Sequence, residues 1–217
     1  MLENNDINKY FTFVEKPFLG CQLFDLEYRN KNIVDLACGN GSHGKHALLN
    51  GANFVKFADA RSENFSQPKK SKNWNWQFVD LNDPIMLDNV LVDQQIILYS
   101  GHFYHTNLHL QILNCFAKTS FEELYFETKV FPNNKDYHEG SPDICWCQES
   151  LTDSELMWHA KEKNILIGQP NFKWTFNELQ KRFTIKNIKV IEGQWYNPSF
   201  KLTVNFYKLM FHCLSQN

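Results

Sequence analysis

The sequence predicts an α/β domain built on a doubly wound, mostly parallel sheet of seven strands that ends in an antiparallel hairpin. Two patterns support this fold class. Between residues 32 and 130, short apolar runs alternate with single helix-like segments, which is typical of parallel β-α-β units. Near the C-terminus, two apolar runs are separated only by a short loop that contains Asn197 and Pro198, and this arrangement indicates a hairpin.

Each element is expected from an apolar run or from helical spacing between turn residues. The predicted strands are residues 32–37, 53–59, 75–80, 94–100, 122–130, 185–192 and 200–210. The predicted helices are residues 43–50, 84–92, 106–117 and 174–183. Asn82, Asp83 and Pro84 supply the start signal for the second of these helices.

Two segments fall outside the alternation and are predicted to flank the functional cleft. Residues 1–30 contain several aromatic residues with weak periodicity, and we interpret them as a helical or irregular N-terminal cap. Residues 131–172 carry prolines, glycines, acids and tryptophans, with one helix-like piece near 152–163. An insertion this long in a compact fold usually forms a lid or a substrate pocket. Residues 1–217 are therefore interpreted as a single domain.

Composition and charge argue against several classes of protein. The formal net charge of −2 does not suit a broadly basic nucleic-acid binder, and the run from Lys69 to Lys72 is interpreted as a solvated loop. The six cysteines lack the spacing of a disulfide framework or a zinc site, so we expect reduced thiols and no metal. The N-terminus lacks signal-peptide features, and no apolar run approaches the ~20 residues of a membrane span. We therefore expect a cytoplasmic protein without a membrane partner.

The stretch DLACGNGSHG, residues 35–44, carries the most informative motif. Gly39, Gly41 and Gly44 follow the spacing G-x-G-x-x-G directly after a predicted strand. Glycines allow a ligand to lie against bare backbone, and the following helix directs its N-terminal amides to the same place. The spacing suits a nicotinamide cofactor and other adenosine cofactors equally, so it does not distinguish between them.

Carboxylates at three strand ends help to distinguish between these classes of cofactor. Asp59 lies twenty residues after Gly39, where a carboxylate can accept both ribose hydroxyls of an adenosine ligand. Asp35 begins the pattern Asp-x-Ala-x-Gly-x-Gly, and Asp80 ends the third predicted strand in QFVDLND. This ordered set resembles the motifs of the class I S-adenosylmethionine-dependent methyltransferases, a Rossmann-like superfamily.

The resemblance implies a role for each position. Asp35 would organise the methionine end of the cofactor, the glycine loop would face the adenosyl part, and Asp80 would receive the adenine amino group. Ala37 stands where the family usually has its first glycine, a departure that requires slightly more room, and Gly44 is then interpreted as coincidental. The predicted contacts to S-adenosyl-L-methionine are Asp35, Ala37, Cys38, Gly39, Asn40, Gly41, His43, Asp59, Ala60, Asp80, Leu81, Ser100 and Gly101.

The resemblance covers residues 31–130 and 174–211, including IILYSGHFYHTN at 96–107 and the closing hairpin, which matches the family's reversed last strand. Within the family, GNGSHG, SGHFYH and YFET are more weakly similar to the enzymes that transfer a carboxymethyl group to the wobble uridine of tRNA. The near-neutral charge argues against tRNA, whose phosphates favour a broad basic face. A small-molecule acceptor is therefore the favoured partner.

Methyl transfer from a sulfonium is an in-line displacement, in which the protein aligns the reacting atoms and removes a proton where the acceptor carries one. His105 is the predicted base, because an imidazole with a pKa of about 6.5 suits proton removal at neutral pH. Tyr104 is predicted to orient the acceptor, and His102 and Glu127 are second choices. Structural roles stay open: His105 could cap the next helix, Tyr104 could pack as an aromatic residue, and Glu127 could pair with a lysine at a sheet edge.

The predicted function is thus S-adenosylmethionine-dependent methylation of a small or medium-sized acceptor. One alternative is transfer of a carboxymethyl or other group from a derivative of the cofactor, which would need a cation beside the sulfonium. Another is a non-catalytic subunit that binds the cofactor for a partner enzyme. Trp146, Trp158 and Trp174 could cage an aromatic or cationic acceptor, although packing of the lid is the simpler interpretation.

Overall fold

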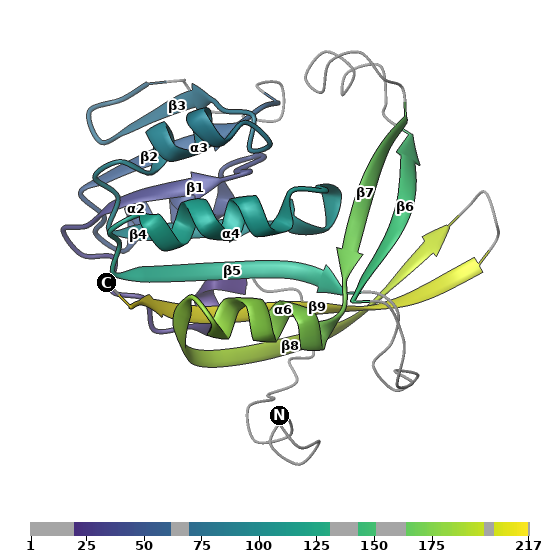
Figure 1. Cartoon of the computed structure of the whole chain (residues 1–217). Coiled ribbons are helices and arrows are strands. Elements are labelled where there is room, and N and C mark those ends of the chain that lie inside the picture. Colours follow the sequence, from purple (N-terminus) through teal and green to yellow (C-terminus); the bar gives the residue numbers. More distant parts are fainter. Residues whose placement is uncertain (1–19, 62–69, 131–142, 151–163, 198–201, 217) are drawn as a thin grey trace.

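A computed structural model describes residues 20–61, 70–130, 143–150, 164–197 and 202–216 of the chain. Its centre is a seven-stranded sheet with the strand order β3-β2-β1-β4-β5-β9-β8 (Figure 1). The first five strands in this order are parallel, whereas β9 is antiparallel to β5 and β8 is antiparallel to β9. This arrangement confirms the predicted fold class. The strands are β1 (Asn32–Leu36), β2 (Phe54–Asp59), β3 (Trp74–Phe78), β4 (Ile96–Ser100), β5 (Glu123–Val130), β8 (Phe183–Asn197) and β9 (Leu202–Ser215).

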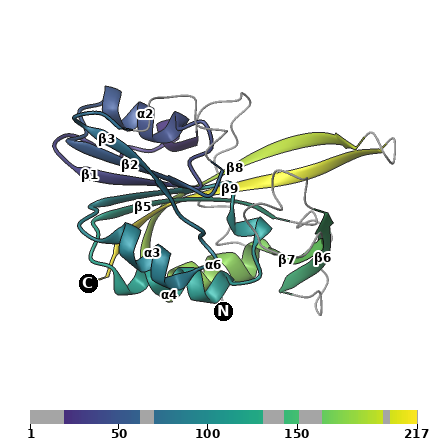
Figure 2. The same ribbon diagram turned by 90° about the horizontal axis from the view of Figure 1, so that it is seen from above.

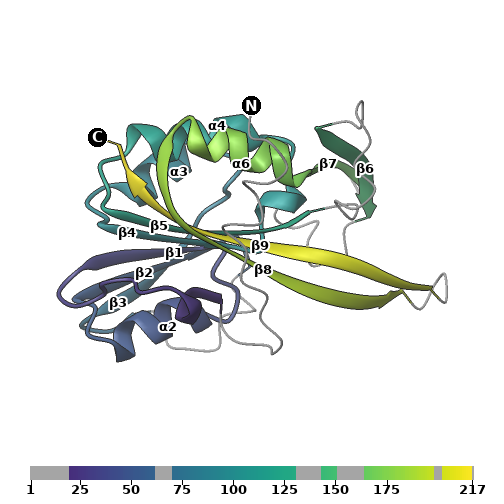
Figure 3. The same cartoon turned by 90° about the horizontal axis from the view of Figure 1, so that it is seen from below.

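Helices cover both faces of the sheet (Figures 2 and 3). One face, called the α2 face below, carries α2 (Ser42–Leu49) and the N-terminal segment that begins with the 3-10 turn η1 (Gly20–Leu23). The opposite α4 face carries α3 (Pro84–Leu91), α4 (His109–Lys118) and α6 (Phe172–Gln180). Because β1 and β4 are covered on both faces, they are nearly continuous runs of buried residues.

The helix starts follow local sequence signals. Asp83 accepts hydrogen bonds from the first-turn amides of α3 and is followed by Pro84, and Asn171 caps α6 in a similar way. The helix predicted from residue 106 begins three residues later. The preceding residues form a separate 3-10 turn, η3 (Phe103–His105), and the Thr106 hydroxyl accepts the amide hydrogen two residues further on.

The segment predicted as an insertion contains a second sheet. β6 (Ile144–Ser150) and β7 (Asn164–Pro170) pair in antiparallel fashion, where the sequence predicts only one helix-like piece near 152–163. That piece lies outside the described residues. The Gly168 amide of β7 donates to the Thr106 carbonyl at 2.9 Å, so the hairpin packs against the end of η3. An isolated two-stranded sheet is only marginally stable, so the hairpin depends on contacts with the rest of the protein. Such contacts cannot be predicted from the sequences of the two strands alone.

His109 anchors the hairpin to α4. Its ring, 2% exposed, donates from Nε2 to the Gly168 carbonyl at 2.8 Å and lies edge-on to the rings of Trp146 and Trp174. Two of the three tryptophans considered for a cage therefore contact a buried histidine, and of these Trp174 packs against the core whereas Trp146 stays 49% exposed. The third, Trp158, lies outside the described residues.

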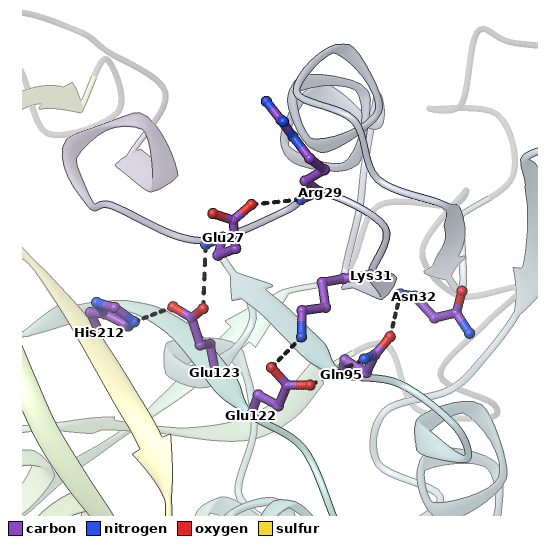
Figure 4. A network of polar contacts seen from close by, with 8 residues as sticks. All are labelled: Glu27, Arg29, Lys31, Asn32, Gln95, Glu122, Glu123 and His212. Atoms are coloured by element: carbon purple, nitrogen blue, oxygen red, sulfur yellow. Dashed lines mark hydrogen bonds and ion pairs between the residues drawn. The ribbon is translucent and has the colours of Figure 1, made fainter.

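Polar contacts fix the N-terminal segment to the sheet (Figure 4). Glu123 on β5 accepts hydrogen bonds from the Glu27 amide at 3.3 Å and from His212 on β9 at 2.6 Å. Lys31, immediately before β1, forms an ion pair with Glu122. The segment that leads into the first strand is thereby joined to β5 and β9, which come much later in the sequence.

The variant His109→Gln tests whether the hairpin anchor titrates. Burial lowers the pKa of His109 below its usual value of 6.5, so the unfolded chain takes up this proton at a higher pH than the folded chain. Wild-type stability should therefore fall as the pH drops below about 6.5. The glutamine variant keeps a donor at the ε position and should lose less stability, by up to about 1 kcal/mol, between about pH 7 and pH 5.5. Urea unfolding at both pH values measures this difference, and equal losses in the two proteins would contradict the prediction.

Candidate functional site

The carboxyl ends of β1, β2 and β4 meet at one edge of the sheet. β1 lies between β2 and β4, and the helix that follows β1 packs on the face opposite to α3 and α4 (Figure 2). This is a topological switch point, the place where ligands bind in open α/β sheets. The loops after these three strands contain most of the predicted cofactor residues.

The loops after β1 and β4 present bare backbone at this edge. Gly39 and Gly41 have left-handed φ angles of 51° and 78°, and Gly101 has a φ of 80°. A Cβ placed on Gly39 or Gly101 would meet no atom of the described residues within 4 Å. Because β1 and β4 are hydrogen-bonded neighbours, the two glycines belong to adjacent loops. A ligand can therefore approach the backbone of both loops.

Asp59, at the end of β2, holds the glycine loop in place. Its buried carboxylate accepts the Gly39 amide at 2.8 Å and the Arg61 amide at 2.7 Å, each on a different oxygen. The Arg61 side chain also forms an ion pair with it at 3.7 Å. An ionised carboxylate can accept further hydrogen bonds, so this geometry is compatible with the predicted contact to ribose hydroxyls. That contact stays a prediction.

Asp35, on β1, holds the first turn of α2. Its Oδ2 accepts the Gly44 amide at 2.8 Å, and the side chain is almost completely buried. Burial raises the pKa of Asp35 to about 8. The Asp59 charge also raises this pKa, and the hydrogen bond from the Gly44 amide lowers it. The observed partner of Asp35 is thus a helix amide, and its predicted role at the methionine end of a cofactor stays a prediction.

The interpretation of Gly44 as coincidental is wrong. A Cβ at this position would lie 2.4 Å from Cε1 of Phe57 and 2.8 Å from Cγ1 of Val55, which is too close for atoms not bonded to each other. The third glycine therefore allows α2 to pack closely on β2, as the third glycine of this spacing does in dinucleotide-binding folds. In this chain the third glycine is thus required for helix packing, and it does not distinguish one cofactor class from the other.

The other predicted cofactor residues surround the same edge. Asp80 lies two residues beyond the end of β3 rather than within the strand, because the pairing of β3 with β2 stops where Phe78 meets the last residue of β2. Its carboxylate accepts the Asn82 amide at 2.9 Å. Asn40 accepts both the amide and the hydroxyl of Ser42 and so fixes the start of α2. The neighbouring members of the predicted set are Ala37, Cys38, Ala60 and Leu81.

Glu127, on β5, lies at the centre of a polar cluster on the α2 face. Its Oε1 accepts hydrogen bonds from the Ser100 hydroxyl at 2.8 Å and the Lys208 ammonium at 2.9 Å, and its Oε2 accepts the Tyr125 hydroxyl at 2.6 Å. Burial alone would raise the pKa of Glu127, but the Lys208 ammonium and the Tyr125 hydroxyl hold it below its usual value. The carboxylate is therefore ionised and bound to three donors, and this agrees with the open alternative of a lysine partner.

The N-terminal segment and α2 enclose this cluster. A Cβ on Gly20 would lie 2.0 Å from the Tyr125 hydroxyl and 2.7 Å from Glu127 Oε2, so η1 can approach so closely only because it begins with glycine. The ring of His43, on α2, lies 5.6 Å from the Tyr125 ring. Its Nε2 is buried without a hydrogen-bond partner among the described residues, and burial lowers the pKa of His43.

The predicted catalytic residues Tyr104 and His105 lie together in η3, just beyond the tip of β4. Their ring centroids are 4.2 Å apart, and the Lys129 ammonium of β5 lies 4.8 Å from the centroid of the Tyr104 ring. His102 shares a hydrogen bond of 2.8 Å with the Tyr99 hydroxyl. The structure thus places Tyr104 and His105 at the expected edge, whereas the roles of base and orienting group stay predictions.

Lys208 is, with Tyr125, a member of the Glu127 cluster that sequence reasoning missed. It lies on β9, directly opposite Lys129 in the pairing of β5 with β9. The alternation along β9 could have assigned Lys208 to a face, but the register between these strands joins segments that are far apart in the chain. Only the assembled sheet shows which carboxylate it meets.

Comparisons with solved structures identify the fold. A proposed S-adenosylmethionine-dependent methyltransferase from Listeria monocytogenes matches with a TM-score of 0.60 and 11% identity, over 90% of this chain and 96% of that one. An S-adenosylmethionine-dependent methyltransferase from Mesorhizobium loti matches with a TM-score of 0.55 and 12% identity, over 89% and 94%. The N-terminal domain of EvdMO1, solved with SAH bound, matches with a TM-score of 0.55 and 14% identity, over 86% and 75%. No protein-family model matches the chain, and no curated protein matches it.

The chain therefore has the class I S-adenosylmethionine-dependent methyltransferase fold, which confirms the fold implied by the sequence motifs. Among the described residues, no group of three or more histidine, cysteine or acidic side chains is arranged to hold a metal ion. None of the described helices combines the length and the apolar character needed to cross a bilayer.

Ala37 provides a test of backbone strain in the first loop. Its φ of 53° lies in the left-handed region, which costs an L-residue roughly 1–2 kcal/mol. Alanine in place of the family's glycine therefore strains the backbone here. Ala37→Gly should raise the free energy of unfolding by about 0.5–1 kcal/mol, because the greater freedom of glycine in the unfolded chain offsets part of the gain. Ala60→Gly, outside the left-handed region, should lower it. Denaturant unfolding of both variants measures the difference, and a loss of stability in Ala37→Gly would contradict the argument.

Gly44→Ala tests the packing of α2 on β2. The added methyl group should lower the free energy of unfolding by about 1–3 kcal/mol, because Phe57 and Val55 must move to make room for it. Lys45→Ala, at the exposed neighbouring position of the same helix, serves as the control and should change stability little. Thermal and urea unfolding report both effects, and equal stability of the two variants would show that the contact is not tight.

Proposed function

We propose that the protein is an S-adenosylmethionine-dependent methyltransferase that acts on a small or medium-sized acceptor. The observation that carries this proposal is the pair of open, left-handed glycines, Gly39 and Gly101, beside the buried carboxylate of Asp59 at the switch point of this fold. At such positions a cofactor can touch backbone without interference from a side chain. Several structural neighbours are described as S-adenosylmethionine-dependent methyltransferases, and this supports the choice of cofactor.

The residues at this edge fit the proposed cofactor. Asp59 retains acceptor capacity for ribose hydroxyls, and Asp80 with Leu81 would hold the adenine. Ser100 and Gly101, at the tip of β4, would face the methionine end. When bound, the cofactor supplies an electrophilic methyl group on a positively charged sulfur.

The remaining chemistry falls to side chains on η3 and β5. His105 would take the proton of the acceptor's nucleophile, and Tyr104 would orient the acceptor beside it. Glu127 would serve as a positioning residue rather than as a base, because it is ionised and holds Ser100 and Lys208 through hydrogen bonds. Alignment of the reacting groups would then supply most of the rate enhancement.

The net charge of the protein favours a small acceptor over tRNA. The net charge of −2 provides no general attraction for a polyanion. A product assay on a panel of metabolites, with wild type and His105→Ala, would separate an enzyme from a non-catalytic binding subunit. Mass spectrometry of the products would separate methyl from carboxymethyl transfer.

Calorimetric titration with S-adenosylhomocysteine (SAH) tests the cofactor. Wild type should bind SAH and should not bind NADH. Gly39→Ala should weaken SAH binding at least about tenfold, because the new methyl group occupies the space open to the ligand. Gly51→Ala is the matched control, since Gly51 also has a left-handed φ, of 92°, but follows α2 at the opposite edge of the sheet.

Both alanine variants should lose similar stability, roughly 1–2 kcal/mol, from the same kind of backbone strain. Only Gly39→Ala should lose affinity for SAH. The proposal fails if wild type shows no heat with SAH, or if NADH binds in its place.

A further inference from the structure

We infer that Lys208 and Lys129, held beside Glu127, form a subsite that binds the carboxylate group of a small acceptor. This inference rests on the proposed function, which it extends by naming the chemical class of the acceptor.

The cluster lies on the acceptor side of the sheet. The residues proposed to hold adenosine, Asp59 and Asp80, follow β2 and β3, on one side of β1 and β4. Lys129 and Lys208 are on β5 and β9, on the other side of β4. Ser100, at the tip of β4, bonds to Glu127 and thus connects the two sides. A group bound at the lysines would therefore lie beyond the cofactor's methionine end, where an acceptor must approach.

Two lysines occupy opposite positions on neighbouring strands in this cluster. Lys129 and Lys208 are directly opposite in the antiparallel pairing of β5 with β9, and both belong to the face that carries Glu127. Side chains in such pairs have Cβ atoms about 4.5–5.5 Å apart, and like charges there repel each other. An anion between the two lysines would turn this repulsion into attraction, and both side chains are long enough to converge on one carboxylate.

The cation of the Glu127–Lys208 ion pair is partly exposed and the anion is buried, which favours an anionic ligand. Glu127 is 5% exposed, and both of its oxygens already accept hydrogen bonds, whereas the Lys208 side chain is 34% exposed. An ammonium carries three donors, of which Glu127 uses one. The part of the ion pair that a ligand can reach is thus its cation, held in place by a buried carboxylate.

The charges favour a carboxylate over a phosphate. Two ammonium groups and the ionised Glu127 leave the cluster with one net positive charge, which a monoanion neutralises, whereas a dianion would leave a partly buried negative charge uncompensated. The ring of Tyr104, whose centroid lies 4.8 Å from the Lys129 ammonium, adds aromatic surface beside the lysines. Benzoate, a small aromatic monoanion, is therefore a suitable probe, benzamide is its neutral counterpart, and phenyl phosphate represents the dianion.

The experiment titrates these three probes into the protein–SAH complex, with ligand-observed NMR or calorimetry as the readout. Benzoate should bind at least tenfold more tightly than benzamide and more tightly than phenyl phosphate. Glu127→Gln keeps both lysines and removes the competing charge, so benzoate should bind at least threefold more tightly. The double variant Glu127→Gln/Lys208→Gln should bind benzoate at least tenfold more weakly than Glu127→Gln alone.

Two controls keep the test decisive. Replacing both partners avoids the buried, unpaired carboxylate that Lys208→Gln alone would leave, so the double variant should remain folded by circular dichroism. Lys186→Gln removes the same charge from an exposed position on β8 and should leave benzoate binding unchanged.

Equal binding of benzoate and benzamide, tighter binding of phenyl phosphate, or undiminished benzoate binding by the double variant would each overturn the inference. Failure of SAH to bind would instead overturn the proposed function. The same benzoate and benzamide titrations without SAH would then still decide the inference.

Discussion

The hydrogen bond from the Gly39 amide to the Asp59 carboxylate is the contact on which the candidate site depends. It joins the loop after β1 to the end of β2 and holds that loop in the left-handed conformation that exposes its backbone. Asp59 is only 3% exposed, so loss of the Gly39 donor would leave a buried carboxylate oxygen without its hydrogen bond, at a cost of about 1–3 kcal/mol. The Arg61 amide occupies the second oxygen and fixes the carboxylate itself. The conformation of the loop is therefore fixed by contacts within the protein itself.

The central strands could be predicted from the sequence because their signals are local. β1 and β4 are short apolar runs covered on both faces, and Asp83 with Pro84 marks the start of α3 within three residues. The β6–β7 hairpin could not be predicted in this way, since it is held by tertiary contacts to His109 and Thr106. For the same reason Asp80 falls outside β3: the length of a strand is set by its pairing partner as much as by its own residues.

The residues of the candidate site also divide into those that local sequence reveals and those that depend on tertiary contacts. Asp35, Gly39 and Asp59 are recognisable because one loop and two adjacent strands place them, and the chain order fixes that geometry. The partners of Glu127 depend on the register of β5 with β9 and on the approach of η1, neither of which is encoded near Glu127. Motif reasoning also undervalued Gly44, because close packing of a helix on a strand leaves no trace in the sequence beyond the glycine itself.

The N-terminal segment determines from which direction the Glu127 cluster can be reached. Near β1 the segment is held by the bond from the Glu27 amide to Glu123, and at η1 the Leu23 carbonyl accepts a hydrogen bond from Lys189. Gly20 then lies directly against the Tyr125 hydroxyl, which closes this side of the cluster.

The exposed part of Lys208 is left as the point of access, on the side of β4 away from Asp59 and Asp80. A cofactor entering over the loops of β1 and β2 and an acceptor entering over β5 and β9 would thus meet at Ser100 from different sides. An in-line displacement requires such an arrangement, because the nucleophile must approach the transferred carbon from the side opposite to the leaving sulfur.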